Sequence, residues 1–175
     1  MTNLSKKNAS IIISASWIFT SNAEGELLSD HSIVIKNDKI IDLIPQSKVF
    51  DDYEASDIYD LSDHILIPGL INAHTHAAMS IFKGFSDDLP LQDWLNNHIW
   101  PAEKKFVNSS FVKDGSVLAL SEMLKSGITT FNDMYFFPDA TAEAAKELGV
   151  RGNIGLVVLD FPTNYAADPE DYLLK

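Results

Sequence analysis

The sequence predicts an α/β protein in which a small antiparallel β unit precedes a parallel sheet with helices. Residues 11–60 contain several short runs rich in β-branched side chains, separated by turn residues. From residue 65 onward, strand-like apolar runs alternate with helical segments, which is typical of βα units. The run at 65–71 is almost continuously apolar, as strands covered on both faces are.

The first of these parts is expected to form an antiparallel unit of short strands. The strand-like segments are 11–20, 32–37, 39–44 and 57–60. Asn22, Glu24 and Gly25 provide the first turn between them. Asn37 and Asp38 stand between the second and third segments, which is the spacing of a tight hairpin.

The beginning of the chain is relevant to where the protein lies in the cell. Lys6 and Lys7 precede an apolar run at 11–19, which imitates the start of a secretory signal. Ser14 and Ser16 interrupt the run, however, and its β-branched residues fit an N-terminal strand at least as well. No stretch approaches the roughly 20 apolar residues of a membrane helix. We therefore expect a cytoplasmic protein without a membrane partner.

The second part is expected to alternate strands with helices. The expected strands are 64–72, 128–134 and 150–159, and helices are expected at 91–100 and 138–148. Ser109 or Ser110 is expected to cap a longer helix, which Gly127 ends in the left-handed conformation. Pro101 is expected to break or redirect the chain, and Gly149 to end the last of these helices.

The number of βα units limits how much of a barrel the chain can form. Two complete units are followed by a third strand and by a helix start after Pro169. A closed eight-stranded barrel takes about 250 residues. If the chain belongs to a barrel, its 175 residues therefore reach less than halfway round.

Composition narrows the classes of function. With 46% apolar residues the chain can bury a sizeable core. The net charge of -12 argues against a nucleic-acid partner, because phosphate binding needs clustered lysine and arginine, and a small molecule is the expected partner. The absence of cysteine excludes a disulfide framework, a thiolate metal site and a cysteine nucleophile. A metal ion would need histidine and carboxylate ligands.

The strongest feature for function is a pair of histidines that ends an apolar strand. His74 and His76 follow the segment Pro-Gly-Leu-Ile-Asn-Ala at 68–73. In an extended chain, side chains at i and i+2 point to the same face, so both imidazoles can reach one ion. The carboxyl ends of barrel strands are also where catalytic groups lie. The alternative is that two polar residues stand by chance where a strand leaves the core.

The segment 68–76 resembles a motif of the amidohydrolase superfamily, and the similarity extends over almost the whole chain. The other segments that carry it are 77–80, 83–84, 87–91, 94–95, 99–103, 122–123, 127–130, 132–138 and 159–162. Together they resemble the methylthioadenosine/S-adenosylhomocysteine deaminases, within the group that also contains the triazine hydrolases. One departure lies at 154–157, where some members carry a substrate-binding arginine, and Arg151 stands too early to take that role.

The resemblance implies the start of a metal-dependent hydrolase TIM (β/α)8 barrel, preceded by a small N-terminal β-sandwich domain. On this basis residues 1–62 form the N-terminal part of the sandwich, and 63–175 form the first βα units of a barrel that is incomplete in this chain. We expect a truncated or split reading frame, or the first part of a longer protein. Such a chain is expected to be inactive unless the rest is supplied.

The resemblance also assigns site residues. His74 and His76 correspond to the two metal ligands of the first barrel strand. Glu103 corresponds to a glutamate that binds the ribose hydroxyls, a role that suits a carboxylate accepting two bonds. Its alternative is a surface carboxylate beside two lysines. Trp94 corresponds to a ring in the pocket wall, although an aromatic residue on a short amphipathic helix is usually core.

Two further residues are weighed but not assigned. His98 lies more than twenty residues after His76, and the family takes its other histidine ligands from later strands, so His98 is expected to be a surface or structural residue. Asp133 ends the second strand of the parallel sheet, where it can support a metal ligand or brace a loop.

The chemistry that the resemblance implies is hydrolytic deamination with one divalent ion, expected to be zinc. Water acidified to a pKa of about 7 would attack C6 of an adenine ring, so that ammonia leaves and the inosine analogue remains. Two histidines also suit Fe, Co, Ni or Mn. The remaining ligands and the general acid/base are expected beyond residue 175, so no catalytic residue is assigned within the chain.

Two alternatives stay open. The first is a triazine- or guanine-type aminohydrolase, or a chlorohydrolase, of the same group, because substrates diverge readily on one fold. The second is a non-catalytic remnant that binds a metal or a partner. The expected partner of the enzyme is a small nucleoside substrate. A homo-oligomer is also open, because members of the group are often oligomeric.

Overall fold

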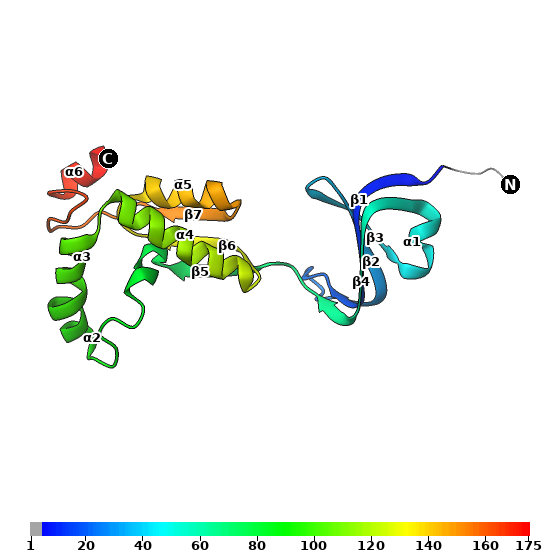
Figure 1. Ribbon diagram of the computed structural model, residues 1–175, viewed down its shortest axis with the longest axis horizontal. Coiled ribbons are helices and arrows are strands. Elements are labelled where there is room, and N and C mark those ends of the chain that lie inside the picture. The colour runs from blue at the N-terminus through cyan, green and yellow to red at the C-terminus, as the bar shows by residue number, and fades with distance from the viewer. Residues whose placement is uncertain (1–4) are drawn as a thin grey trace. The chain divides into compact units, whose positions relative to one another are not determined.

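The structure, a computed structural model, describes residues 5–175, which divide into two compact units at 5–68 and Gly69–Lys175. Figure 1 traces both along the chain. Each unit contains its own sheet and is described by itself. Within residues 5–175, no helix combines the length and the apolar character needed to span a membrane.

The first unit is a four-stranded sheet with one short helix. Its elements are β1 (Lys7–Phe19), β2 (Leu27–Lys36), β3 (Lys39–Pro45), α1 (Gln46–Asp52) and β4 (Tyr53–Leu66). The strand order is β3-β2-β1-β4. Ile12, Val34 and Val49 are fully buried and pack together, so α1 covers one face of this sheet. The apolar run near the start of the chain thus forms a strand, β1.

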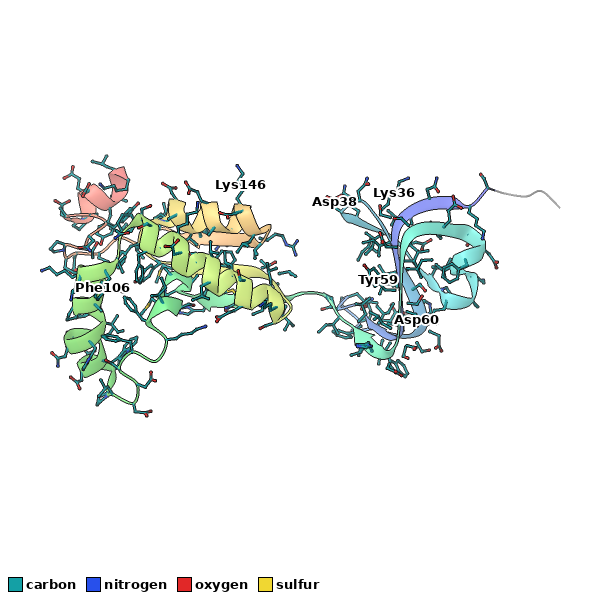
Figure 2. All side chains as sticks on the ribbon, in the orientation of Figure 1. Lys36, Asp38, Tyr59, Asp60, Phe106 and Lys146 are labelled. Carbon is teal, nitrogen blue, oxygen red and sulfur yellow. The ribbon has the colours of Figure 1, made fainter. Side chains whose placement is uncertain are left out.

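The expected antiparallel arrangement is correct for β1, β2 and β3 but wrong for β4. β2 pairs antiparallel with both neighbours, and Asn37, with a φ of 56°, lies in the expected hairpin turn. Figure 2 shows the side chains of Lys36 and Asp38 beside it. β4 instead pairs in parallel with β1. A parallel pair requires a crossover connection, and the unexpected helix α1 lies in that connection.

The second unit is a parallel sheet covered by helices. Its elements are β5 (Leu70–Thr75), η1 (Ala77–Phe82), α2 (Leu91–Asp93), η2 (Trp94–Ile99), α3 (Trp100–Phe106), α4 (Ser109–Lys125), β6 (Ile128–Met134), α5 (Pro138–Leu148), β7 (Arg151–Gly155) and α6 (Pro169–Leu174). The sheet order is β5-β6-β7. Phe131 of β6 packs against Leu120 of α4 and Ala144 of α5, so both helices cover one face. Figure 2 shows Lys146 of α5 extending away from the sheet.

Two expected strands have different bounds. The strand expected at 64–72 is divided, because β4 ends at Leu66 and β5 begins at Leu70. Pro68 lies in the interval, and its missing N–H cannot join a ladder. The strand expected at 150–159 ends at Gly155. Gly155 pairs with Met134, the last residue of β6, so the chain beyond Gly155 has no neighbouring strand in this sheet to bond to.

The helical region at 91–106 is longer than expected, because Pro101 does not break it. α2, the π-helix η2 and α3 follow one another directly. The N–H of Trp100 bonds to the carbonyl of Leu95, five residues back, which is the wider π-type ladder. Pro101 comes next and has no N–H to donate to the ladder, and the wider π-type turn of η2 stands directly before it.

The ends of the other helices agree with the sequence in most places. Asn108, rather than Ser109 or Ser110, caps α4, since its side-chain oxygen accepts a hydrogen bond from the backbone N–H of Phe111 at 3.0 Å. Gly127 and Gly149 follow α4 and α5 with φ values of 81° and 71°, as expected. A short helix, α6, begins at the expected proline.

Candidate active site

His74 and His76 lie at the carboxyl end of β5, where the pairing of β5 with β6 is irregular. β5 advances by three residues, from Asn72 to Thr75, where β6 advances by two. The extra residue is a β-bulge, which changes the side-chain alternation beyond it. The two imidazole rings lie 5.1 Å apart between centroids, at an interplanar angle of 76°. The structure therefore brings the predicted pair together.

The ring of His76 is held in one orientation by the end of β6. Its Nδ1 lies 2.6 Å from the carbonyl oxygen of Met134. A carbonyl can only accept, so Nδ1 carries a proton, and in the neutral ring Nε2 then keeps its lone pair. A metal-binding histidine is commonly oriented in this way, by a carbonyl bound to the other ring nitrogen.

Asp133 fixes the chain immediately after His76. One carboxylate oxygen, Oδ1, accepts the backbone N–H of Ala77 at 2.7 Å. The side chain is 1% exposed, and within residues 5–175 its other oxygen, Oδ2, is buried without a hydrogen-bond partner. Burial raises the pKa of this carboxyl, while the bond from Ala77 and the charge of His76 oppose the rise. An unpaired buried carboxylate oxygen so close to two imidazoles marks a polar site rather than ordinary core.

Glu103 of α3 lies on the same side of the site, joined to the loop after β6. The hydroxyl of Tyr135 donates to Glu103 Oε1 at 2.7 Å. The ring of Tyr135 is 6.2 Å from that of His76 between centroids. Burial raises the pKa of Glu103, while the Tyr135 hydroxyl and the charge of His76 lower it. Tyr135 has its own pKa raised far above the usual value by burial and by Glu103.

An apolar cavity of about 390 Å³ adjoins Glu103. Its lining comes from α3, from the loop after β6 and from the segment after β7. The lining residues are Trp100, Glu103, Lys104, Val107, Phe136, Leu159, Phe161, Pro162, Thr163 and Asn164. The rings of Trp100 and Phe161 lie 5.9 Å apart between centroids and form part of one wall. A carboxylate beside a mostly apolar cavity can bind a ligand that is polar at one end and apolar at the other.

Asn164 ties the segment after β7 to the end of α3. Its side-chain amide donates to the carbonyl oxygens of Lys104 and Val107, both at 2.9 Å, and to that of Glu103 at 3.3 Å. The carbonyl of Glu103 also accepts the N–H of Val107, whereas those of Lys104 and Val107 belong to the end of the helix and its cap, where helical partners are missing. One side chain therefore satisfies the helix end and holds the cavity wall in place.

The other predicted residues lie apart from this cavity. Trp94 is half-buried in η2 and is not among the residues that line the cavity, whereas Trp100 is. His98 is occupied locally, since its Nδ1 lies 2.8 Å from the Ser86 hydroxyl and its ring packs edge-on against Phe85. Within residues 5–175 no cluster of three or more histidine, cysteine, aspartate or glutamate side chains could hold a metal. His74 and His76 thus form a pair.

Sequence reasoning did not find Tyr135, Trp100, Phe161 or Asn164 as parts of the site. All four lie in or near segments that carry the resemblance, but that signal identifies a segment and not a contact. The bond between Tyr135 and Glu103, for example, joins residues 32 positions apart. No periodicity or spacing in the chain predicts that contact.

Comparison with known proteins identifies the family of this chain. A sequence model of the amidohydrolase family matches residues 65–173. A 5-methylthioadenosine/S-adenosylhomocysteine deaminase of Saccharophagus degradans is 48% identical over all of this chain and over 39% of its own length. Another such deaminase, from Thermodesulfovibrio yellowstonii, is 48% identical over 94% of this chain and 38% of its own length. This chain thus spans about two fifths of the length of these relatives.

Among solved structures, an adenosine deaminase from Xanthomonas campestris with bound zinc has a TM-score of 0.91 and 35% identity. The match covers 97% of this chain and 39% of that one. An atrazine chlorohydrolase from Arthrobacter aurescens complexed with zinc has a TM-score of 0.79 and 22% identity. That match covers 94% of this chain and 41% of the chlorohydrolase chain. The second likeness, at that identity, concerns the fold alone.

Proposed function

The chain belongs to the amidohydrolase family, and on that basis we propose that it contributes part of the active site of a metal-dependent nucleoside deaminase. The proposed substrates are 5′-methylthioadenosine and S-adenosylhomocysteine, the compounds named for its relatives. One observation carries the proposal: the ring of His76, which is paired with that of His74, and the carboxylate of Glu103 both lie beside Tyr135.

The donor set fits a divalent ion. His76 presents a free Nε2, and the His74 ring lies beside it. We propose these two residues as ligands and zinc as the ion, while Fe, Co, Ni or Mn would also suit imidazole. When bound, the ion would supply hydroxide at neutral pH by acidifying water. Catalytic zinc usually has three protein ligands, so a complete site requires a further ligand and an acid/base group besides these residues.

The residues of this chain would orient the nucleoside. A Glu103 oxygen accepts hydrogen bonds from ribose hydroxyls, and the adjoining cavity receives an apolar substituent on the 5′ carbon. Its wall of Trp100 and Phe161 suits a methylthio group. Water adds to C6, the bond from C6 to the exocyclic nitrogen breaks, and ammonia leaves. Trp94 stays a predicted wall residue for another part of the substrate pocket.

We further propose that the two units correspond to two parts of the family's architecture. The parallel order β5-β6-β7, with helices between the strands, supports the first βα units of a (β/α)8 barrel. The two histidines and the Met134 carbonyl lie at the carboxyl ends of β5 and β6, where catalytic groups lie in such barrels. The four-stranded sheet of the first unit would be the N-terminal part of a β-sandwich domain.

The deciding experiment uses the polypeptide encoded by the whole reading frame that contains this chain. Ammonia release is measured from both proposed nucleosides, from guanine and from a triazine, with and without added zinc. Zinc-dependent release from the nucleosides should fall to background in the double variant His74→Ala/His76→Ala. His64→Ala is the matched control, because His64 is an exposed histidine of the first unit.

The outcomes separate the proposal from its alternatives. Release from guanine or the triazine alone would assign the chain to another activity of the group. Turnover that survives the double substitution would remove His74 and His76 from the mechanism. A folded protein that binds zinc and releases neither ammonia from these compounds nor chloride from a chlorinated triazine would be a non-catalytic remnant.

A further inference from the structure

Four successive residues at the end of β6 each hold a different part of the site. The Asp133 carboxylate accepts the N–H of the residue after His76, and the Met134 carbonyl orients the His76 ring. The Tyr135 hydroxyl binds Glu103, and Phe136 lines the cavity. The position of Glu103 relative to the histidine pair is therefore set through one short segment of chain.

Tyr135 is held rigidly enough to act as such a link. It is 5% exposed and belongs to a cluster of buried apolar residues with Ala78, Val107 and Val112. Its ring also lies 5.0 Å from that of Phe136 between centroids. A ring packed on these sides cannot swing its hydroxyl to a different partner, so the carboxylate that it binds is fixed as well.

We propose that Tyr135 is a positioning residue for substrate binding: its hydroxyl occupies Oε1 of Glu103 and leaves Oε2 as the acceptor for a substrate diol. This inference rests on the proposed function. Tyr135 touches no reacting atom and acts through Glu103. The simpler alternative is a core tyrosine that satisfies its hydroxyl on the nearest carboxylate. In that case its loss would affect all substrates alike.

The first test pairs Tyr135→Phe with a change in the substrate. The assay uses the whole reading frame and compares methylthioadenosine with its 2′,3′-dideoxy analogue, which keeps the base and the 5′ group. The substitution should lower kcat/KM for the diol substrate about tenfold or more, mainly through KM, because a hydrogen bond to a charged group is lost. The value for the dideoxy analogue should stay nearly unchanged. Equal losses on both substrates would overturn the proposal.

Two variants complete this test. Tyr53→Phe is the matched control, since the Tyr53 hydroxyl also donates to a carboxylate, that of Asp42, at 2.7 Å in the first unit. It should not discriminate between the two substrates. In a Glu103→Gln background, Tyr135→Phe should add little further loss on the diol substrate, because the two residues act as a coupled pair. Full additivity of the two effects would contradict the proposal.

A second readout needs neither metal nor turnover. In the 175-residue chain with ¹³C-labelled glutamate side chains, NMR follows the pKa of Glu103. Tyr135→Phe should raise that pKa, since it removes a donor that stabilises the carboxylate. An unchanged pKa in a folded variant would overturn the coupling whatever the activity. Failure of the proposed function would instead appear as absence of nucleoside turnover in the unsubstituted protein.

Discussion

Replacement of Gly115 by alanine tests whether α4 supports the turn after His76 as closely as the structure indicates. Gly115 is buried on α4, and a Cβ built on it would lie 2.3 Å from the carbonyl oxygen of Ala78 and 2.9 Å from its Cα. Ala78 stands in η1, two residues after His76. Both contacts are with backbone, so no rotamer change can relieve them. Either the helix or the turn must move.

The expected magnitude follows from two opposing effects. Alanine is favoured over glycine within a helix by about 0.5–1 kcal/mol. Overpacking of a close-packed core costs about 1–3 kcal/mol, and a clash against backbone belongs near the upper end. The net loss in the free energy of unfolding for Gly115→Ala should therefore be about 2 kcal/mol. A shift of η1 should also displace the ring of His76 from its partner Met134.

The assay is urea denaturation of the 175-residue chain, followed by circular dichroism, with zinc affinity as a second measurement. Asp114→Ala is the matched control, because Asp114 is the exposed neighbour on the same helix. It should change stability by no more than about 0.5 kcal/mol. If Gly115→Ala unfolds at the same or a higher urea concentration than the unsubstituted chain, the close contact between α4 and η1 is refuted. Unchanged zinc affinity in a destabilised variant would show that this turn does not affect the proposed metal site.

Two further predictions concern single residues of the second unit. Burial raises the pKa of Glu103 in the folded state above its ordinary value of 4.5. Protonated Glu103 therefore stabilises the fold below pH 4.5, and this stability is lost as the pH rises through the folded pKa. Glu103→Gln should flatten this decline, which urea midpoints measured from pH 4 to pH 7 will detect, and an unchanged slope would argue against a buried carboxylate. Asn108→Ala should lower stability by about 1 kcal/mol through loss of the α4 cap, while Ser109→Ala should be almost neutral. A larger effect at Ser109 would indicate that Ser109, as expected from the sequence, caps α4 instead.

The fold was predictable where local chemistry decides the structure. Asn37 lies in the expected tight turn and Gly127 and Gly149 follow helices as expected, and all three adopt positive φ, which few other residues do without strain. The direction of β4 was not predictable in this way. Whether a strand joins its sheet parallel or antiparallel depends on which edge is free, and the connection through α1 sets that edge. A short helix of seven residues leaves only a weak pattern in the sequence.

In the candidate site, too, only the features that local sequence determines were predictable. His74 and His76 stand out because their spacing itself suggests that both rings bind one metal ion. The structure places the rings beyond a bulge that the spacing does not reveal. Glu103 was reached only through resemblance to a family. Tyr135, which joins Glu103 to the end of β6, has no sequence signal, since the bond depends on packing between segments far apart in the chain. Contacts of this kind follow from the fold rather than from any local rule.

The tryptophans show how helix type decides which side chain reaches the cavity. On a regular helix of about 3.6 residues per turn, two residues six positions apart lie about 120° apart around the axis, so Trp94 and Trp100 cannot share a face. The π-helical ladder between them changes that relation further, because it fits more residues into each turn. Amphipathic periodicity assumes the regular helix and therefore assigns the wrong angular position to residues beyond η2. The phase at Trp100 depends on η2 and on the Pro101 that follows it, and this phase places Trp100 against Phe161 in the cavity wall.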